Sequence, residues 1–402
     1  MTYQTTTTNP PAGRARKLNI GVFFGSRSPE HDVSIITAQM IIKALKNLNK
    51  YEIVPIYLDK KGRWRISEKM GDIKFFQDAN FEKNLNKLGE YLLNLDCSKD
   101  FLEFQSKDGG LFSKRKSIII DVAFPAFHGS FGEDGTIQGL FEILNIPYVG
   151  CGVLASALAM NKIVSRKIFE KEGFSVVNYL YFNKNSFEKK QEEIFQKIEN
   201  NLTYPVFVKP NLLGSSIGVS KVANRKELEF AMEVVFQFDK KTIIEEAVPN
   251  LIEANCAIIG NLEKELIASL PEQPIYKQDF QTFEEKYLTK GGTIKKGAKK
   301  NIIPAPLPSD KLEEIQKLAK KAYQTLGCAG ISRVDFLVDA KAMKIYINEI
   351  NTLPGTLQFH LWEASGITRE QLVEKLINYG LQSFKERKKL IYTFNSSLMN
   401  QS

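Results

Sequence analysis

The sequence predicts a protein of the α/β and α+β classes in which three domains surround one cleft. Three observations support this prediction. The chain has 402 residues, and because domains commonly hold about 100–200 residues, two to four compact units are expected. Short apolar runs alternate with helical patterns as far as about residue 150, as in a parallel sheet with crossover helices. Later strands follow one another directly, as in antiparallel sheets.

Composition limits the classes of protein to consider. Hydrophobic residues make up 43% and charged residues 25% of the chain, which is typical of globular proteins and excludes collagen-like and disordered chains. No apolar run in the sequence is long enough for a membrane-spanning helix. The four cysteines lie far apart without a CxxC pair. We therefore expect no structural zinc site, and we expect a reducing compartment, the cytoplasm.

The first domain is predicted over residues 18–151, after a disordered leader at 1–17. Its first apolar run, 18–24, is typical of a buried parallel strand. Ser28-Pro29-Glu30 offers a capping hydroxyl, an early proline and an early acid, which predict a helix to about Leu48. Segment 60–116 is expected to be irregular. The other predicted elements are strands at 51–58, 117–124 and 147–149 and a helix at 136–144.

The second domain is predicted over residues 152–245 and the third over 246–384, followed by a basic and polar tail at 385–402. The second domain is expected to contain helices at 155–171 and 225–236 and strands at 175–181, 204–208, 219–222 and 242–244. The third is expected to contain strands at 255–259, 332–338 and 344–350, a Lys-Gly loop at 286–300, and helices at 309–325 and 368–384.

Two strands of the third domain carry candidate metal ligands. The turn-like segment 339–343 should join them as a hairpin, and side chains alternate between the faces of a strand. Glu349 and Asn351 then share one face. Arg333 and Asp335 also share a face, and cross-strand neighbours lie about 5 Å apart. Two carboxylates and an amide oxygen at that spacing suit Mg²⁺, although a solvated polar face is the alternative interpretation.

A lysine and a Gly/Ser loop form a candidate phosphate site in the second domain. Lys209 ends an apolar strand, and Gly214-Ser215-Ser216-Ile217-Gly218 follows it closely. This arrangement can place an ammonium group and backbone N–H groups against a polyphosphate. The sequence contains no GxxxxGK[ST] motif and so no Walker P-loop. An ordinary hairpin turn is the alternative.

The loop from His128 to Thr136 is a third candidate, because open α/β sheets bind ligands at the carboxyl ends of their strands. It can also be a helix entry capped by Asp134 or Thr136. A GxGxxA match at Gly150 and Gly152 is weak evidence for a dinucleotide site, since no acidic residue ends a second strand about 20 residues later. We instead expect these glycines to form the crossing between two domains.

The formal net charge of +9 lies mainly at the ends of the chain. The leader contributes +3 and residues 385–389 contribute another +3, which leaves +3 for residues 18–384. Lysines at 295–300 lack interleaved aromatic residues, so they suit a lid over phosphates better than a single-stranded nucleic-acid site. We expect neither a nucleic-acid partner nor a membrane partner.

Taken together and in order, several motifs resemble the D-alanine–D-alanine ligases of the ATP-grasp superfamily over about residues 18–382. The motifs are segments 28–34, 128–139, 155–162, the Lys209…Gly214-Ser215-Ser216 loop, 285–288, 333–335 and 348–355. The resemblance implies an ATP-grasp fold after an N-terminal parallel α/β domain. It implies that ATP phosphorylates one D-alanine and that the amine of a second displaces the phosphate, giving a peptidoglycan precursor in the cytoplasm.

The resemblance also implies a set of residues that bind ATP and metal. Those implied for ATP are Lys162, Lys209, Ser215, Ser216, Glu245, Val248, Glu253 and Lys286. The lysines and the serine loop would hold phosphates, Lys286 from the lid would meet the transferred phosphoryl group, and the remaining three would contact adenine and ribose. Those implied for two Mg²⁺ ions, or Mn²⁺, are Asp335, Glu349 and Asn351.

A second implied set acts on the D-alanine substrates. Glu30 would pair with the ammonium group of the first D-alanine and connect through Ser215 to Tyr287. Arg333 and the Gly355 N–H would stabilise the oxyanion of the tetrahedral intermediate. The resemblance also favours a homodimer formed through the N-terminal domain.

One segment departs from the family pattern. After Gly355 the chain reads Thr356-Leu357-Gln358-Phe359-His360-Leu361-Trp362, which is shorter than the usual stretch that brings a serine to the second substrate's carboxylate. His360 or Gln358 is a candidate substitute. The acceptor is therefore left open between D-alanine and the alternatives D-lactate, D-serine or another amine or hydroxyl.

Overall fold

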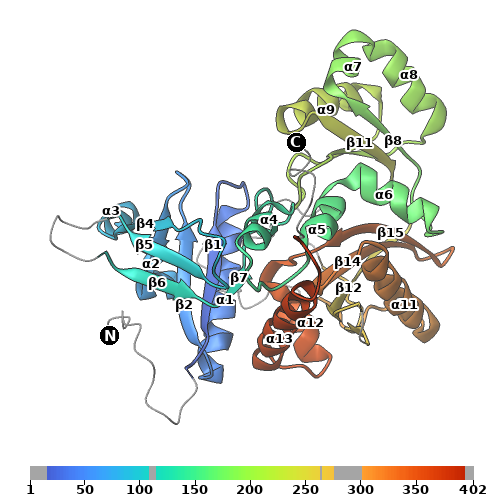
Figure 1. The fold of residues 1–402 in the computed structure, drawn as a ribbon. Coiled ribbons are helices and arrows are strands. Elements are labelled where there is room, and N and C mark those ends of the chain that lie inside the picture. The colour runs from blue at the N-terminus through green and yellow to red at the C-terminus, as the bar shows by residue number, and fades with distance from the viewer. Residues whose placement is uncertain (1–15, 108–114, 263–264, 276–300, 394–402) are drawn as a thin grey trace, which may run out of the picture.

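The computed structural model describes residues 16–107, 115–262, 265–275 and 301–393. Three sheets organise these residues, and Figure 1 shows them as a blue N-terminal group, a green group and a yellow-to-red group. Residues 1–15 of the expected leader, residues 394–402 of the expected tail and the whole of the expected 286–300 loop lie outside the described residues.

The first sheet has seven strands in the order β6-β5-β4-β3-β2-β1-β7. As predicted from its apolar run, β1 (Asn19–Gly25) is a buried strand, parallel to β2 (Glu52–Leu58) and β7 (Val122–Pro125). The other strands pair antiparallel and are β3 (Trp64–Ile66), β4 (Glu90–Leu93), β5 (Leu102–Ser106) and β6 (Ser117–Ile120). The expected strand at 147–149 forms a single parallel bridge, Ala123 to Tyr148.

The prediction that segment 60–116 is irregular is wrong. It contains β3, β4 and β5 together with the short helices η1 (Glu68–Gly71), α2 (Ile73–Gln77) and α3 (Phe81–Asn86). Its strands are short and only half-buried, so a few apolar side chains suffice to fix them. Trp64 and Phe104 pack edge-on against each other, and both pack against Phe23 of β1.

Two helices cover the first sheet. α1 (His31–Leu48) begins three residues after Ser28, because the Ser28 hydroxyl accepts the Glu30 N–H at 3.1 Å and forms a turn before the helix. α4 (Thr136–Ile143) starts after Gly135, whose φ of 90° favours glycine. Asp134 supports this entry by accepting the Thr136 N–H at 3.0 Å.

Glu103 on β5 should make the stability of the first domain depend on pH. Its carboxylate accepts hydrogen bonds from Ser117, Lys99 and Asn94 at 2.5, 2.9 and 3.0 Å, which lower the pKa to about 2. A depressed folded-state pKa stabilises the fold above the unfolded-state pKa, and this contribution is lost as the pH falls through the folded value. We expect Glu103→Gln to lower the free energy of unfolding by about 2 kcal/mol at pH 7. Urea unfolding should show a smaller loss at pH 3, and an equal loss at both pH values would contradict this assignment.

The second sheet is antiparallel, in the order β10-β9-β11-β8. Its strands are β8 (Tyr179–Asn183), β9 (Val206–Pro210), β10 (Ser220–Val222) and β11 (Lys241–Glu246). An apolar cluster joins it to the helices α7 (Lys184–Lys189), α8 (Gln191–Asn201) and α9 (Arg225–Phe238). The strand expected at 175–181 is β8, which begins at Tyr179 and ends at Asn183.

The helix expected at 155–171 is two helices, α5 (Val153–Met160) and α6 (Lys162–Lys171). Asn161 between them has an extended backbone, and its side chain accepts the Val164 N–H at 3.1 Å as the cap of α6. This break places Lys162 in the first turn of a helix.

The third sheet is antiparallel, in the order β13-β12-β14-β15. Its strands are β12 (Leu251–Gly260), β13 (Ile267–Ala268), β14 (Gly330–Asp339) and β15 (Lys344–Asn351), and the hairpin predicted for the last two is confirmed. The helices of this part are α11 (Ser309–Thr325), η2 (Gly355–Gln358), α12 (Phe359–Ala364) and α13 (Arg369–Arg387). α11 has the predicted bounds, and α13 begins one residue later and ends three residues later than predicted.

The third sheet is tied to the first domain as well as to the second. α13 packs on both α1 and the third sheet, because Leu372 and Leu376 share one apolar cluster with Ile41 and Ile331. Gly150, at the junction of the first two domains, lies against Gly330, the first residue of β14. A Cβ added to Gly330 would lie only 2.9 Å from Gly150 Cα. The chain therefore crosses β14 at Gly150 in close backbone contact.

Candidate active site

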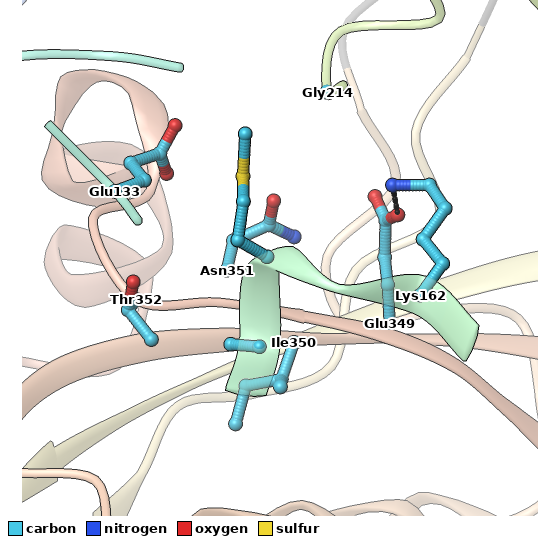
Figure 2. Close-up of a pocket in the computed structure, with 9 residues that line it drawn as sticks. Glu133, Lys162, Gly214, Glu349, Ile350, Asn351 and Thr352 are labelled. Atoms are coloured by element: carbon cyan, nitrogen blue, oxygen red, sulfur yellow. Dashed lines mark ion pairs between the residues drawn. The ribbon is translucent and has the colours of Figure 1, made fainter. Parts of the chain in front are cut away.

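A pocket lies where the three parts of the molecule meet. It is lined by the loop before α4, by α5 and α6, by the loop after β9, and by β15. The lining residues are Glu133, Ala159, Met160, Lys162, Gly214, Glu349, Ile350, Asn351 and Thr352. Figure 2 shows the Lys162 and Glu349 side chains pointing toward one another in this pocket.

The two expected phosphate-binding lysines both reach carboxylates. Lys162 Nζ lies 3.1 Å from Glu349 Oε2 and donates to the Leu213 carbonyl at 2.9 Å. Lys209, on β9, forms an ion pair with Glu245 on β11. Lys162 of α6 is thereby linked to β15, and Lys209 of β9 is linked to β11.

The β14–β15 hairpin brings the three candidate metal ligands together. Asp335 lies directly opposite Glu349, and Asn351 Nδ2 donates to Asp335 Oδ2 at 3.1 Å. The register shifts after Asp335, so that Asn348 is an extra residue in β15. Such β-bulges commonly re-aim side chains beside active sites. Two carboxylates and an amide oxygen on one face are the donors that Mg²⁺ prefers, so these residues fit that ion.

Cations contact both carboxylates of this set. Arg333 Nε and Nη2 each lie 2.6 Å from an oxygen of Asp335. Burial opposes ionisation of Glu349, but Lys162 and Lys209 outweigh it and hold its pKa at about 2. Glu349 is therefore a carboxylate at neutral pH.

Glu30 and the Ser215 loop meet across two domains. Ser215 Oγ donates a hydrogen bond to Glu30 Oε1, and Ser215 and Ser216 both have left-handed backbones with φ of 53° and 60°. Gly129 also packs closely against the Glu30 carboxylate, because a Cβ at Gly129 would lie 2.6 Å from Glu30 Oε2. The structure thus brings together Glu30 and Ser215. Lys286 and Tyr287 lie outside the described residues.

Glu245 is held between two cations. Its two carboxylate oxygens pair with Arg166 of α6 and Lys209 of β9. Burial opposes ionisation, yet Arg166 and Lys209 lower the pKa of Glu245 below its usual value. Arg166 also donates to the Ile347 carbonyl at 2.9 Å, which links α6 to β15.

The remaining expected ligands lie around this group. Val248 is half-buried in the loop after β11. Glu253 lies on the same face of β12 as Asn255, which is directly opposite Asp335. Gly355 opens η2, and its carbonyl accepts a hydrogen bond from Gln358 Nε2 at 3.0 Å.

Two charged residues near the site, Arg166 and Glu272, were not predicted as site residues from the sequence. Arg166 lies four residues after Lys162 on one face of α6, a spacing that could have identified it. Glu272 accepts hydrogen bonds from His360 Nε2 at 2.6 Å and from Asn301 Nδ2 at 2.8 Å. No sequence signal connects Glu272 and His360, which are 88 residues apart.

The described residues contain neither a membrane-spanning helix nor a cluster of three metal-binding side chains of the His, Cys, Asp or Glu type. None of the described helices has the length and apolar character needed to cross a membrane. In the same part of the chain, no group of three or more His, Cys, Asp or Glu side chains is placed to hold a metal ion. The candidate metal set has only two carboxylates, and its third member is an amide.

Comparisons with known proteins agree with this architecture. Residues 19–151 match the family model described as D-ala D-ala ligase N-terminus, and residues 168–378 match D-ala D-ala ligase C-terminus. A D-alanine–D-alanine ligase from Thermosipho melanesiensis is 41% identical over 372 residues, which are 92% of this chain and 96% of the relative.

Two solved structures show similar folds, which places this chain among the ATP-grasp folds. The VanG D-Ala:D-Ser ligase from Enterococcus faecalis is 32% identical with a TM-score of 0.73, covering 91% of this chain and 100% of that chain. The D-alanine–D-alanine ligase from Bacillus anthracis complexed with ATP is 28% identical with a TM-score of 0.64, covering 93% and 100%. On these matches to both domains and over most of its length, the chain belongs to the D-alanine–D-alanine ligase family.

Proposed function

We propose that the protein is an ATP-dependent ligase that joins two D-alanine molecules into a dipeptide precursor of peptidoglycan, in the cytoplasm. One observation carries the proposal. Lys162, Glu349 and Asn351 line a single pocket together with Gly214, and the next residue of that loop, Ser215, donates a hydrogen bond to Glu30. A polyphosphate site and a site for an amino acid therefore adjoin. The names of the relatives favour D-alanine as the acceptor over D-lactate or D-serine.

The chemistry requires activation, because a carboxylate and an amine do not condense in water unaided. ATP would phosphorylate the first D-alanine, and the amine of the second would then displace phosphate. Lys162 and Lys209 would bind the phosphates of ATP, and Val248, Glu253 and Glu245 would surround its nucleoside. In phosphoryl transfer, such positioning and charge stabilisation account for most of the catalysis.

Asp335, Glu349 and Asn351 would hold Mg²⁺. When bound, Mg²⁺ neutralises phosphate charge. In the structure, Lys162 pairs with Glu349 and Arg333 pairs with Asp335. Binding of Mg²⁺ to these two carboxylates would therefore release both basic side chains. Lys162 would then turn to a phosphate, and Arg333, together with the Gly355 N–H, to the oxyanion.

Glu30 would bind the ammonium group of the first D-alanine, since it is a buried carboxylate that already accepts a hydrogen bond from Ser215. The Ser215-Ser216 loop would close over the phosphates, with Lys286 and Tyr287 completing the site. Excluding water matters here because an acylphosphate hydrolyses readily. We also propose a homodimer, which light scattering of the purified protein would measure.

Purified protein given ATP, Mg²⁺ and D-alanine alone should form one ADP and one phosphate per dipeptide. ADP release and mass spectrometry of the product check this, and a chelator should stop the reaction until Mg²⁺ or Mn²⁺ is restored. Parallel reactions add D-serine or D-lactate, with L-alanine as the control. Turnover only after D-serine or D-lactate is added would reject D-alanine as the acceptor.

A further inference from the structure

The chain after Gly355 has an unusual backbone. Thr356, Leu357 and Gln358 have φ of 52°, 49° and 53°, so three consecutive residues that are not glycine adopt the left-handed conformation. Residues with a Cβ disfavour this conformation. It persists only where the surrounding structure enforces it, and it occurs preferentially at functional sites.

Two side chains hold one peptide unit at the start of this turn. The peptide between Gly355 and Thr356 contributes the Gly355 carbonyl and the Thr356 N–H. Gln358 Nε2 donates to that carbonyl at 3.0 Å, and the N–H donates to Thr37 Oγ1 at 3.1 Å. The peptide plane is therefore fixed at both of its polar atoms.

Thr37 belongs to a different domain from the turn that it holds. It is a fully buried residue of α1, and its Oγ1 also lies 2.8 Å from Nε2 of the buried His128. His128 precedes Gly129, which packs against the Glu30 carboxylate. A continuous path of contacts thus runs from Glu30, through the His128 loop and Thr37, to the Gly355 peptide.

We propose that Thr37 is a positioning residue for the ligation step: by holding the peptide between Gly355 and Thr356, it fixes the backbone of Gly355 and with it the direction of the Gly355 N–H, which belongs to the preceding peptide. This inference rests on the proposed function. In that step the amine nitrogen bonds to the acyl carbon, the bond from that carbon to the phosphate oxygen breaks, phosphate leaves with the electron pair, and the nitrogen loses a proton to solvent. A displaced Gly355 peptide slows this attack but leaves the earlier phosphorylation intact.

When attack by the amine is slower, the acylphosphate persists for longer and a larger fraction of it is hydrolysed by water. Hydrolysis returns the carboxylate and releases phosphate, so ATP is consumed without dipeptide. The ratio of ADP to dipeptide therefore reports the position of the Gly355 peptide. A general loss of stability would lower both products together and leave this ratio at one.

The test compares variants of two buried hydroxyls on α1. Thr37→Val removes Oγ1 and keeps the volume, whereas Thr37→Ser keeps the hydroxyl. Ser34→Ala is the matched control, because Ser34 Oγ is also buried but, among the described residues, its hydrogen bonds are to the Ala126 carbonyl and the Gly25 N–H, both in the first domain. We expect Thr37→Val to slow dipeptide formation about 10- to 100-fold and to raise the ratio of ADP to dipeptide above one.

Thr37→Ser should restore the ratio to one and the rate to within about threefold, and Ser34→Ala should keep the ratio at one. If thermal unfolding shows that Thr37→Val is not folded, Gln358→Met removes the other hydrogen bond to the same peptide and should raise the ratio alike. A ratio of one in the folded variants overturns the proposal. Failure of the proposed function is seen separately, as wild-type protein that forms no dipeptide.

Discussion

Glu349→Gln is expected to lower Mg²⁺-dependent turnover about 100- to 1,000-fold while the protein stays folded. The amide keeps the shape of the side chain but removes the negative charge that faces Lys162 at 3.1 Å and that would hold the cation. The Glu349 side chain is 27% exposed, so losing its ion pair should cost only about 1 kcal/mol of stability. ADP release measured over a range of Mg²⁺ concentrations, together with thermal unfolding, checks both parts.

Asp339→Asn is the matched control for this variant. Asp339 ends β14 four residues after Asp335, and it accepts the backbone N–H groups of Lys341 and Ala342 in the hairpin turn. Asparagine can accept the same bonds, so the control removes one charge from the same hairpin at its other end. Turnover of Glu349→Gln within tenfold of this control would reject Glu349 as a metal ligand.

The hairpin that carries Glu349 could be predicted from sequence because its signals are local. A short turn between two runs with period-two alternation determines which side chains share a face. The bulge at Asn348 interrupts this alternation, because the buried residues Ile345 and Ile347 are followed by Ile350 and not by residue 349. The shared face of Glu349 and Asn351 was therefore predictable, whereas the bulge was not predicted, although the spacing of three residues between the apolar Ile347 and Ile350 could have indicated it.

Contacts between domains could not be derived from local pattern. The bond between Ser215 and Glu30 joins residues 185 apart, and only the family resemblance suggested it. The contact of Thr37 with Thr356 spans 319 residues, and neither residue type indicates a partner. Likewise, Asn161 interrupts a helical pattern without Gly or Pro, so only its capping preference could have revealed the break before Lys162.

Glu245→Gln should weaken both the fold and ATP binding. Its carboxylate and the guanidinium of Arg166 are each only 2% exposed, and removing one partner of a buried ion pair leaves the other charge uncompensated. We expect the free energy of unfolding to fall by about 3 kcal/mol. We also expect the KM for ATP to rise about tenfold, since Lys209 loses the carboxylate that orients it. Urea unfolding and steady-state kinetics measure these two effects.

Glu246→Gln provides the control, one residue later on the same strand and therefore on its opposite face. Glu246 accepts hydrogen bonds from Asn178 Nδ2 and the Thr203 N–H, both at 2.8 Å in an exposed setting, so its variant should lose less than about 1 kcal/mol. The comparison separates two roles for Glu245. A carboxylate that only contacts adenine would raise the KM for ATP without destabilising the fold beyond the control. Because Arg166 and Lys209 pair with its two oxygens, we expect the stability to fall as well, which would make Glu245 the group that holds Lys209 toward the phosphates.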